Sequence, residues 1–83
     1  MENQTNIFKT SDIKISAFLL CKDIPLLELD KENMRKIFFC FQNSNEVAKL
    51  LNVYWSDQAT VNPRLLFEKL DYLKDLIHGN YEI

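Results

Sequence analysis

The chain has 83 residues, of which 47% are hydrophobic and 27% charged, and ten Lys and Arg against twelve Asp and Glu give a formal net charge of -2. This length allows one small domain and excludes a two-domain enzyme, while the ordinary composition excludes a disordered tail or a fibrous repeat. The charge balance argues against a dedicated nucleic-acid binder, which needs many cations to neutralise phosphates.

The compartment is indicated by the start of the chain and by the cysteines. Met1 is followed by polar residues rather than by a secretory signal, and the longest apolar runs are five residues, whereas a membrane-spanning helix needs about 20. Cys21 and Cys40 lack the close spacing of a zinc or redox motif. One disulfide is an alternative, but free thiols in a reducing cytosol are favoured. We therefore expect a cytoplasmic protein that does not contact membranes.

Residues 1–9 have no hydrophobic period, which predicts a loosely docked N-terminal arm before a single domain over 10–83. A capping signal at 10–12 and the apolar spacing that follows predict a first helix over about 11–22. Ile13 to Ser16 also alternates as a strand would. The predicted helix is apolar nearly all round, and such a helix is usually wedged deep in its domain or covered by a partner.

Pro25 ends this helix, and the alternation after it, a polar turn and the aromatic run 37–41 predict a β-hairpin. Ile37, Phe39 and Phe41 would share one face of the second strand, with Phe38 on the other. A lone hairpin is marginal in water, so helices must pack on it or another molecule must extend it.

Two more helices are predicted in the second half of the chain. Asn43 and Glu46 resemble a capping box at the start of a helix over about 44–56. Asn62 and Pro63 start a third helix, which runs to His78 with a glycine after it. The predicted fold is a small single α+β domain of order α-β-β-α-α, an antiparallel β-hairpin packed with three helices.

Catalytic and cofactor sites are not indicated by any residue pattern. His78, the single histidine, lies at a predicted helix end, where it complements the helix dipole. The single glycine, Gly79, cannot form a phosphate-binding loop. We therefore expect a protein that is not an enzyme and that uses no metal or cofactor.

Partner binding is predicted at two groups of residues. Trp and Arg are enriched at binding hot spots, so an exposed Trp55 next to Tyr54 and followed by Arg64 would mark an interface. Alternatively, Trp55 caps the core and Arg64 stacks on it. On the third helix an apolar stripe is either internal or an association surface; its residues are Leu65, Tyr72 and Leu76.

The alternative function is nucleic-acid binding through the hairpin. Arg35 and Lys36 could meet phosphates while bases stack on Phe38 and the neighbouring aromatic residues. The competing interpretation is that these aromatic rings are buried against helices.

The Tyr54-Trp55 pair and the segment Val61-x-Pro63-Arg64-x-Leu66-Phe67-x-x-Leu70-x-x-Leu73-Lys74 resemble a family of small bacterial and phage proteins of unknown function, over about residues 9–78. The resemblance implies no catalytic residues and a cytoplasmic accessory protein encoded on a phage or another mobile element. Together these interpretations predict a non-enzymatic interaction module that binds a larger protein of unknown identity and associates with itself.

Overall fold

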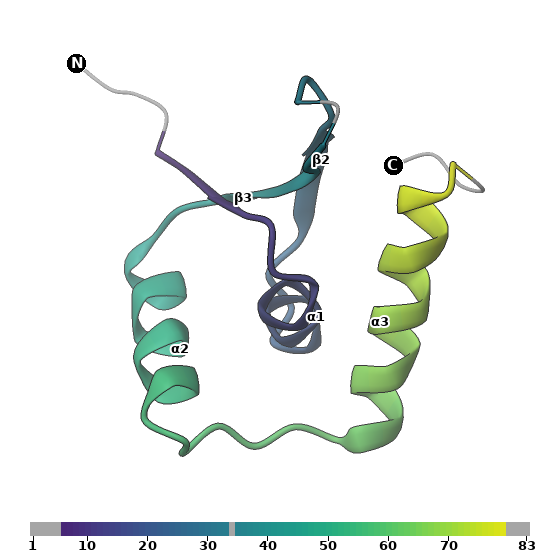
Figure 1. The fold of residues 1–83 in the computed structure, drawn as a ribbon. Coiled ribbons are helices and arrows are strands. Elements are labelled where there is room, and N and C mark those ends of the chain that lie inside the picture. The colour runs from purple at the N-terminus through teal and green to yellow at the C-terminus, as the bar shows by residue number, and fades with distance from the viewer. Residues whose placement is uncertain (1–5, 34, 80–83) are drawn as a thin grey trace.

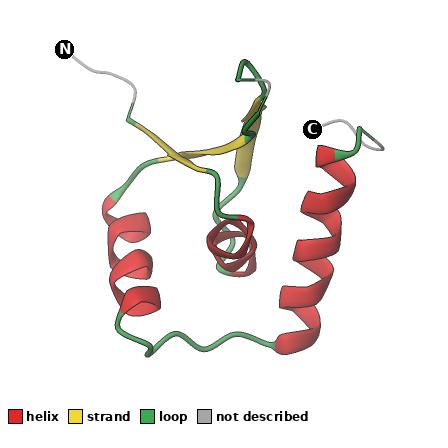
Figure 2. Ribbon diagram, viewed as in Figure 1, coloured by secondary structure: helices red, strands yellow, loops and turns green. Residues whose placement is uncertain are grey.

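The computed structural model describes residues 6–33 and 35–79. The described chain contains three helices and a three-stranded antiparallel sheet, which confirms the α+β class (Figures 1 and 2). In chain order the elements are β1 (Ile7–Thr10), α1 (Ile13–Cys21), β2 (Leu26–Asp30), β3 (Phe38–Gln42), α2 (Asn45–Trp55) and α3 (Pro63–Ile77).

The first strand, β1, corrects the prediction of an arm over residues 1–9 and of a sheet with two strands. Ile7–Thr10 pairs antiparallel with β3, with Phe8 opposite Phe41, and the strand order is β1-β3-β2. Residues 1–5 lie outside the described residues. Four residues are too few to show a period, and β1 forms because β3, far away in sequence, offers an unpaired edge.

The two faces of the sheet have different surroundings. Phe39 and Phe41 of β3 are buried and belong to the hydrophobic core. Cys40 points to the opposite face, yet only 1% of it is exposed. Lys9 on β1 and Asp30 on β2 form an ion pair of 2.8 Å that joins the two outer strands across β3 at this position. Polar side chains therefore cover the face that carries Cys40.

Helix α1 lies beneath the sheet, between α2 and α3 (Figure 1). Its residues 15–19 are all buried, so the expectation of a helix deep in the domain is confirmed. The core contains side chains from this helix, the sheet and both flanking helices: Ile15, Ala17, Phe18, Leu19, Ile24, Phe39, Phe41, Val47, Leu73 and Leu76.

The helix starts follow local hydrogen bonds, and one of them differs from its prediction. Asn62 accepts hydrogen bonds from the first amides of α3, as its position before Pro63 predicts. At α2 the cap is Ser44, which accepts from the amide of Val47 at 3.1 Å. Asn43 accepts from the Ser44 amide instead, so the predicted Asn43–Glu46 capping box does not form. Ser44 takes this role because its backbone is extended, the conformation that an N-cap residue adopts.

The end of α3 agrees with its prediction. His78 is the C-terminal cap residue, and Gly79 follows it with a φ of 79°, in the left-handed region that glycine adopts most easily.

Candidate protein interface

The C-terminal end of α2 presents an exposed tryptophan beside a half-buried tyrosine. Trp55 is 68% exposed. The Tyr54 ring meets the Trp55 ring edge to face at 5.2 Å between centroids, and it lies 5.4 Å from the Phe18 ring of α1. Tyr54 therefore connects the core to the exposed indole. This placement rejects the alternative in which Trp55 caps the core.

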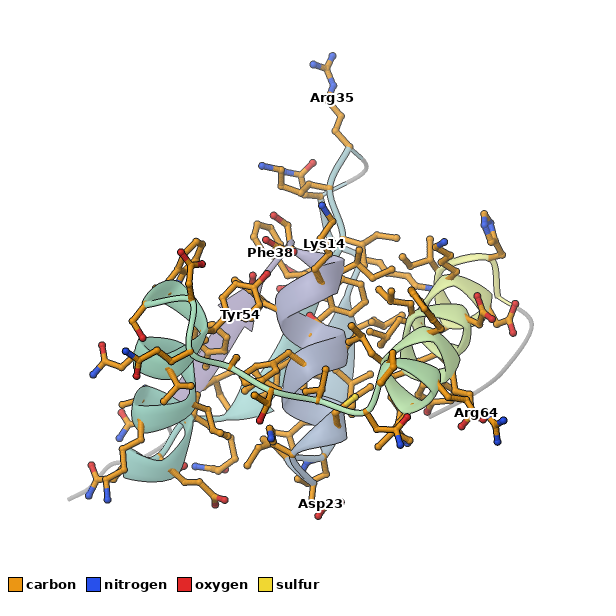
Figure 3. The ribbon with its side chains drawn as sticks, turned by 90° about the horizontal axis from the view of Figure 1, so that it is seen from below. Lys14, Asp23, Arg35, Phe38, Tyr54 and Arg64 are labelled. Atoms are coloured by element: carbon orange, nitrogen blue, oxygen red, sulfur yellow. The ribbon has the colours of Figure 1, made fainter. Side chains whose placement is uncertain are left out.

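Arg64 lies apart from these two aromatic residues. It is exposed on the first turn of α3, and Figure 3 shows it on the opposite side of α1 from Tyr54. Within the described residues Arg64 makes no cation–π contact with Trp55. The loop over residues 56–62 separates the end of α2, which carries Trp55, from the start of α3, which carries Arg64. The two residues are close in the sequence, but the structure does not bring their side chains together.

The predicted stripe on α3 is only partly at the surface. Leu65 is half-buried and Tyr72 is exposed. Leu76 is 2% exposed and belongs to the core, which removes it from the candidate interface. Its burial follows from the packing of α3 against α1, the helix at the centre of the domain.

Phe67 is an exposed residue that sequence reasoning did not select. It is 62% exposed on α3, with Arg64 one turn before it and Asp71 one turn after it on the same face. The exposure of Phe67 could have been predicted from the spacing of apolar residues along the helix. At 100° per residue, Phe67 falls outside both apolar stripes of α3.

A pocket of about 360 Å³ opens between α1, the end of α2, the 56–62 loop and α3. A hydrogen bond of 2.7 Å from the Lys22 Nζ to the Thr60 carbonyl ties the loop to α1. The same ammonium lies 5.8 Å from the centre of the Phe18 ring. The pocket is lined by Lys14, Phe18, Tyr54, Ala59, Val61, Leu66 and Leu70.

The polar groups of this pocket are hydrogen-bond donors at neutral pH. Lys14 is its only charged lining residue, and it forms no ion pair within the described part of the chain. Burial, together with the nearby charge of Asp12, raises the pKa of the Tyr54 phenol, which therefore stays protonated. The pocket combines an apolar lining with a cation and a hydroxyl.

The hairpin offers less for nucleic acid than its sequence pattern suggests. Arg35 extends into solvent, and Lys36 is also exposed (Figure 3). A hollow of about 460 Å³ lies beside them. Phe39 and Phe41 are buried, so bases cannot stack on them. Phe38 is half-buried, and the carboxylate-bearing Asp30 is its cross-strand neighbour.

No group of three or more side chains that could hold a metal ion gathers in the described residues. Both cysteines are free, and burial raises the pKa of the Cys40 thiol, which keeps it protonated at neutral pH. None of the described helices has the length and apolar content needed to cross a membrane.

A family model described as a domain of unknown function, DUF5659, matches residues 5–79. The chain belongs to this family. The DUF5659 match contains all the described helices and strands, from β1 to α3. It agrees with the resemblance to a family of unknown function. No similar protein was found among curated proteins or solved structures.

Proposed function

We propose that this protein is a non-enzymatic interaction module that binds a larger protein through its Trp55 surface, defined as Tyr54, Trp55 and the pocket beside them. The observation that carries the proposal is the 68% exposed Trp55, held by Tyr54 next to an apolar pocket of about 360 Å³. Tryptophan dominates many binding hot spots because it buries a large area and loses little conformational freedom.

The rigidity of the surface supports this proposal. Tyr54 is packed on the buried Phe18, and the loop that closes the pocket is tied to α1 by Lys22. A preorganised surface loses little entropy on binding, so more of its contact energy appears as affinity. Arg64 and Phe67 on α3 provide a second exposed region that a larger partner could reach.

The remaining parts of the proposal concern context. We place the protein in the cytoplasm of a bacterium, encoded by the host or by a phage, as the sequence resemblance implies.

We also propose that it self-associates, with Leu65 and Tyr72 at the contact. Size-exclusion chromatography with light scattering across a range of concentrations tests this, and a single monomeric mass throughout would contradict it.

The main experiment is a comparative pull-down with tagged wild-type protein and two variants from the same helix. Trp55→Ala should weaken retention of a specific partner by about 30-fold, the effect of losing a hot spot worth about 2 kcal/mol. Val53→Ala, an exposed control on α2, should retain the partner within about twofold. Circular dichroism confirms that both variants are folded. Equal retention by wild type and Trp55→Ala would reject the proposal.

A second candidate function is nucleic-acid association, favoured by the exposed Arg35 and Lys36 beside the hollow of about 460 Å³. Nuclease treatment of the same lysate separates the two functions. Recovery that disappears with nuclease and with the double variant Arg35→Ala, Lys36→Ala would favour this candidate. Recovery that survives both treatments supports the protein interface.

A further inference from the structure

The pocket of the Trp55 surface has an uneven distribution of charge. Six of its lining residues carry no formal charge, and Lys14 is the seventh. Lys14 lies one turn before Phe18 on α1, and Lys22, the C-cap residue of α1, lies four positions after Phe18 with its ammonium 5.8 Å from the centre of that ring. Lys22 donates to the Thr60 carbonyl, whereas Lys14 has no ion-pair partner within the described residues. One of the two flanking cations is therefore available.

The acidic residue nearest to Lys14 in sequence has another role. Asp12 is the N-cap of α1, and its carboxylate accepts hydrogen bonds from the amides of Lys14 and Ile15 at 2.8 and 3.2 Å. Its charge also acts on Tyr54, whose protonated hydroxyl is a donor. A partner carboxylate placed at the Tyr54 hydroxyl would therefore be repelled by Asp12. Lys14 is the one charged residue in the pocket lining, so an incoming carboxylate would pair with its ammonium, whereas an incoming ammonium would be repelled by it.

The position of these groups is visible from the side of α1 opposite the sheet (Figure 3). Lys14 lies on α1 and Tyr54 on α2, and both line the same pocket, whose other walls come from the loop and α3. The apolar walls suit an aliphatic or aromatic side chain of a partner, because burying such a side chain contributes about 1.5–3 kcal/mol.

We propose that this pocket recognises a partner segment in which one apolar side chain enters the pocket and a neighbouring carboxylate pairs with Lys14. The proposal rests on the proposed function, because the segment belongs to the partner protein. Charge complementarity selects an acidic anchor over a basic one, as interfaces do when charged groups set specificity.

The test uses two small probes that share one apolar side chain, N-acetyl-leucine with its free carboxylate and the neutral N-acetyl-leucinamide. Trp55 is the chain's only tryptophan, so its fluorescence reports on this surface, and amide NMR shifts map the contact. We expect shifts at Lys14, Ala59 and Val61, and an affinity about two- to fivefold higher for the carboxylate, as for an exposed ion pair. Added salt should reduce that preference.

Two variants and a control complete the design. Lys14→Glu should abolish or reverse the preference for the carboxylate, and it is expected to fold because Lys14 is exposed. Ala59→Leu, which fills the pocket from the loop, should weaken both probes. Gln58→Leu adds the same side chain at the neighbouring exposed position and should leave both affinities unchanged. If Ala59→Leu fails to fold, Lys14→Glu still decides the question.

The outcomes separate this inference from the proposed function. Equal affinities for the two probes, shifts confined to other surfaces, or an unchanged preference in Lys14→Glu would overturn the inference. If Trp55→Ala loses the partner while Lys14→Glu and Ala59→Leu keep it, the proposed function stands and this anchor is rejected. If the carboxylate preference is observed but no protein depends on Trp55, the proposed function fails and the partner segment fails with it.

Discussion

Helix α3 carries large apolar residues in two different environments, which determines what each side chain contributes. Leu73 is fully buried in the core, whereas Phe67 on the same helix is 62% exposed. Burial removes apolar surface from water and surrounds it with close-packed atoms, and an exposed ring gains little of either. Residue type alone therefore does not predict stability along this helix.

We expect Leu73→Ala to lower the free energy of unfolding by about 2–5 kcal/mol, because it leaves a cavity in the core. Phe67→Ala should change the free energy of unfolding by no more than about 0.5 kcal/mol. Urea denaturation followed by circular dichroism measures both variants. Similar losses for the two would show that Phe67 contributes to the core.

The Lys9–Asp30 ion pair predicts a dependence of stability on pH. The hydrogen bond and charge of Lys9 lower the pKa of Asp30, and Asp30 raises the pKa of Lys9. The contribution of Asp30 is present above the ordinary aspartate pKa of about 3.9 and is lost as pH falls through the lowered pKa. The contribution of Lys9 is present below about pH 10.4 and is lost as pH rises through the raised pKa.

Thermal unfolding of wild type and Asp30→Asn measures this effect. The difference between the two proteins should be constant near neutral pH and should shrink on strong acidification. It should also shrink in high salt, because the pair is exposed to solvent. A difference that grows as the pH falls would contradict the assignment.

At the level of elements, helix starts were predictable because their signals are local. Asn62 and Pro63 place the cap and the first residue of α3 within a few residues of each other. At α2 the polar residues Asn43, Ser44 and Asn45 precede or begin the helix, and each is a residue type that can cap a helix. The extended backbone of Ser44 in the structure makes it the cap. β1 was missed because its pairing partner, β3, is distant in the sequence, with Ile7 opposite Gln42 and Thr10 opposite Phe39.

The choice of cap can be tested directly. Ser44→Ala should lower the free energy of unfolding by about 0.5–2 kcal/mol, because the amide of Val47 loses its acceptor. Asn43→Ala should cost less, since Asn43 accepts only from the neighbouring amide. Chemical denaturation measures the free energy of unfolding of both variants. A larger loss for Asn43→Ala than for Ser44→Ala would support the capping box predicted from sequence.

At the level of the whole molecule, the three helices lie on one side of the sheet, and the 56–62 loop spans α1 between α2 and α3 (Figure 1). The candidate interface is on this helical side. Its lining comes from all three helices and the loop, and its one charged residue is Lys14. Association there should depend mainly on apolar contact.

We therefore expect the affinity for a protein partner to change by less than about threefold between 50 and 200 mM salt. Nucleic-acid binding through the two cations Arg35 and Lys36 should instead fall about tenfold, because each neutralised phosphate adds about -0.9 to the slope of log affinity against log salt. Isothermal titration calorimetry or surface plasmon resonance with the captured partner measures this dependence. A steep loss with salt would favour the Arg35 and Lys36 surface.

Sequence alone determined the α+β class, the three helices and the hairpin, because hydrophobic periodicity, prolines and caps act over a few residues. It also indicated Tyr54 and Trp55 as candidate binding residues, because aromatic residues next to a predicted helix end can be recognised from the sequence. The tertiary structure decided that Leu76 is buried, that Phe67 and Trp55 are exposed, and that β1 completes the sheet. It alone assembled the pocket around Lys14, because burial and cavities depend on contacts between segments that are distant in the chain.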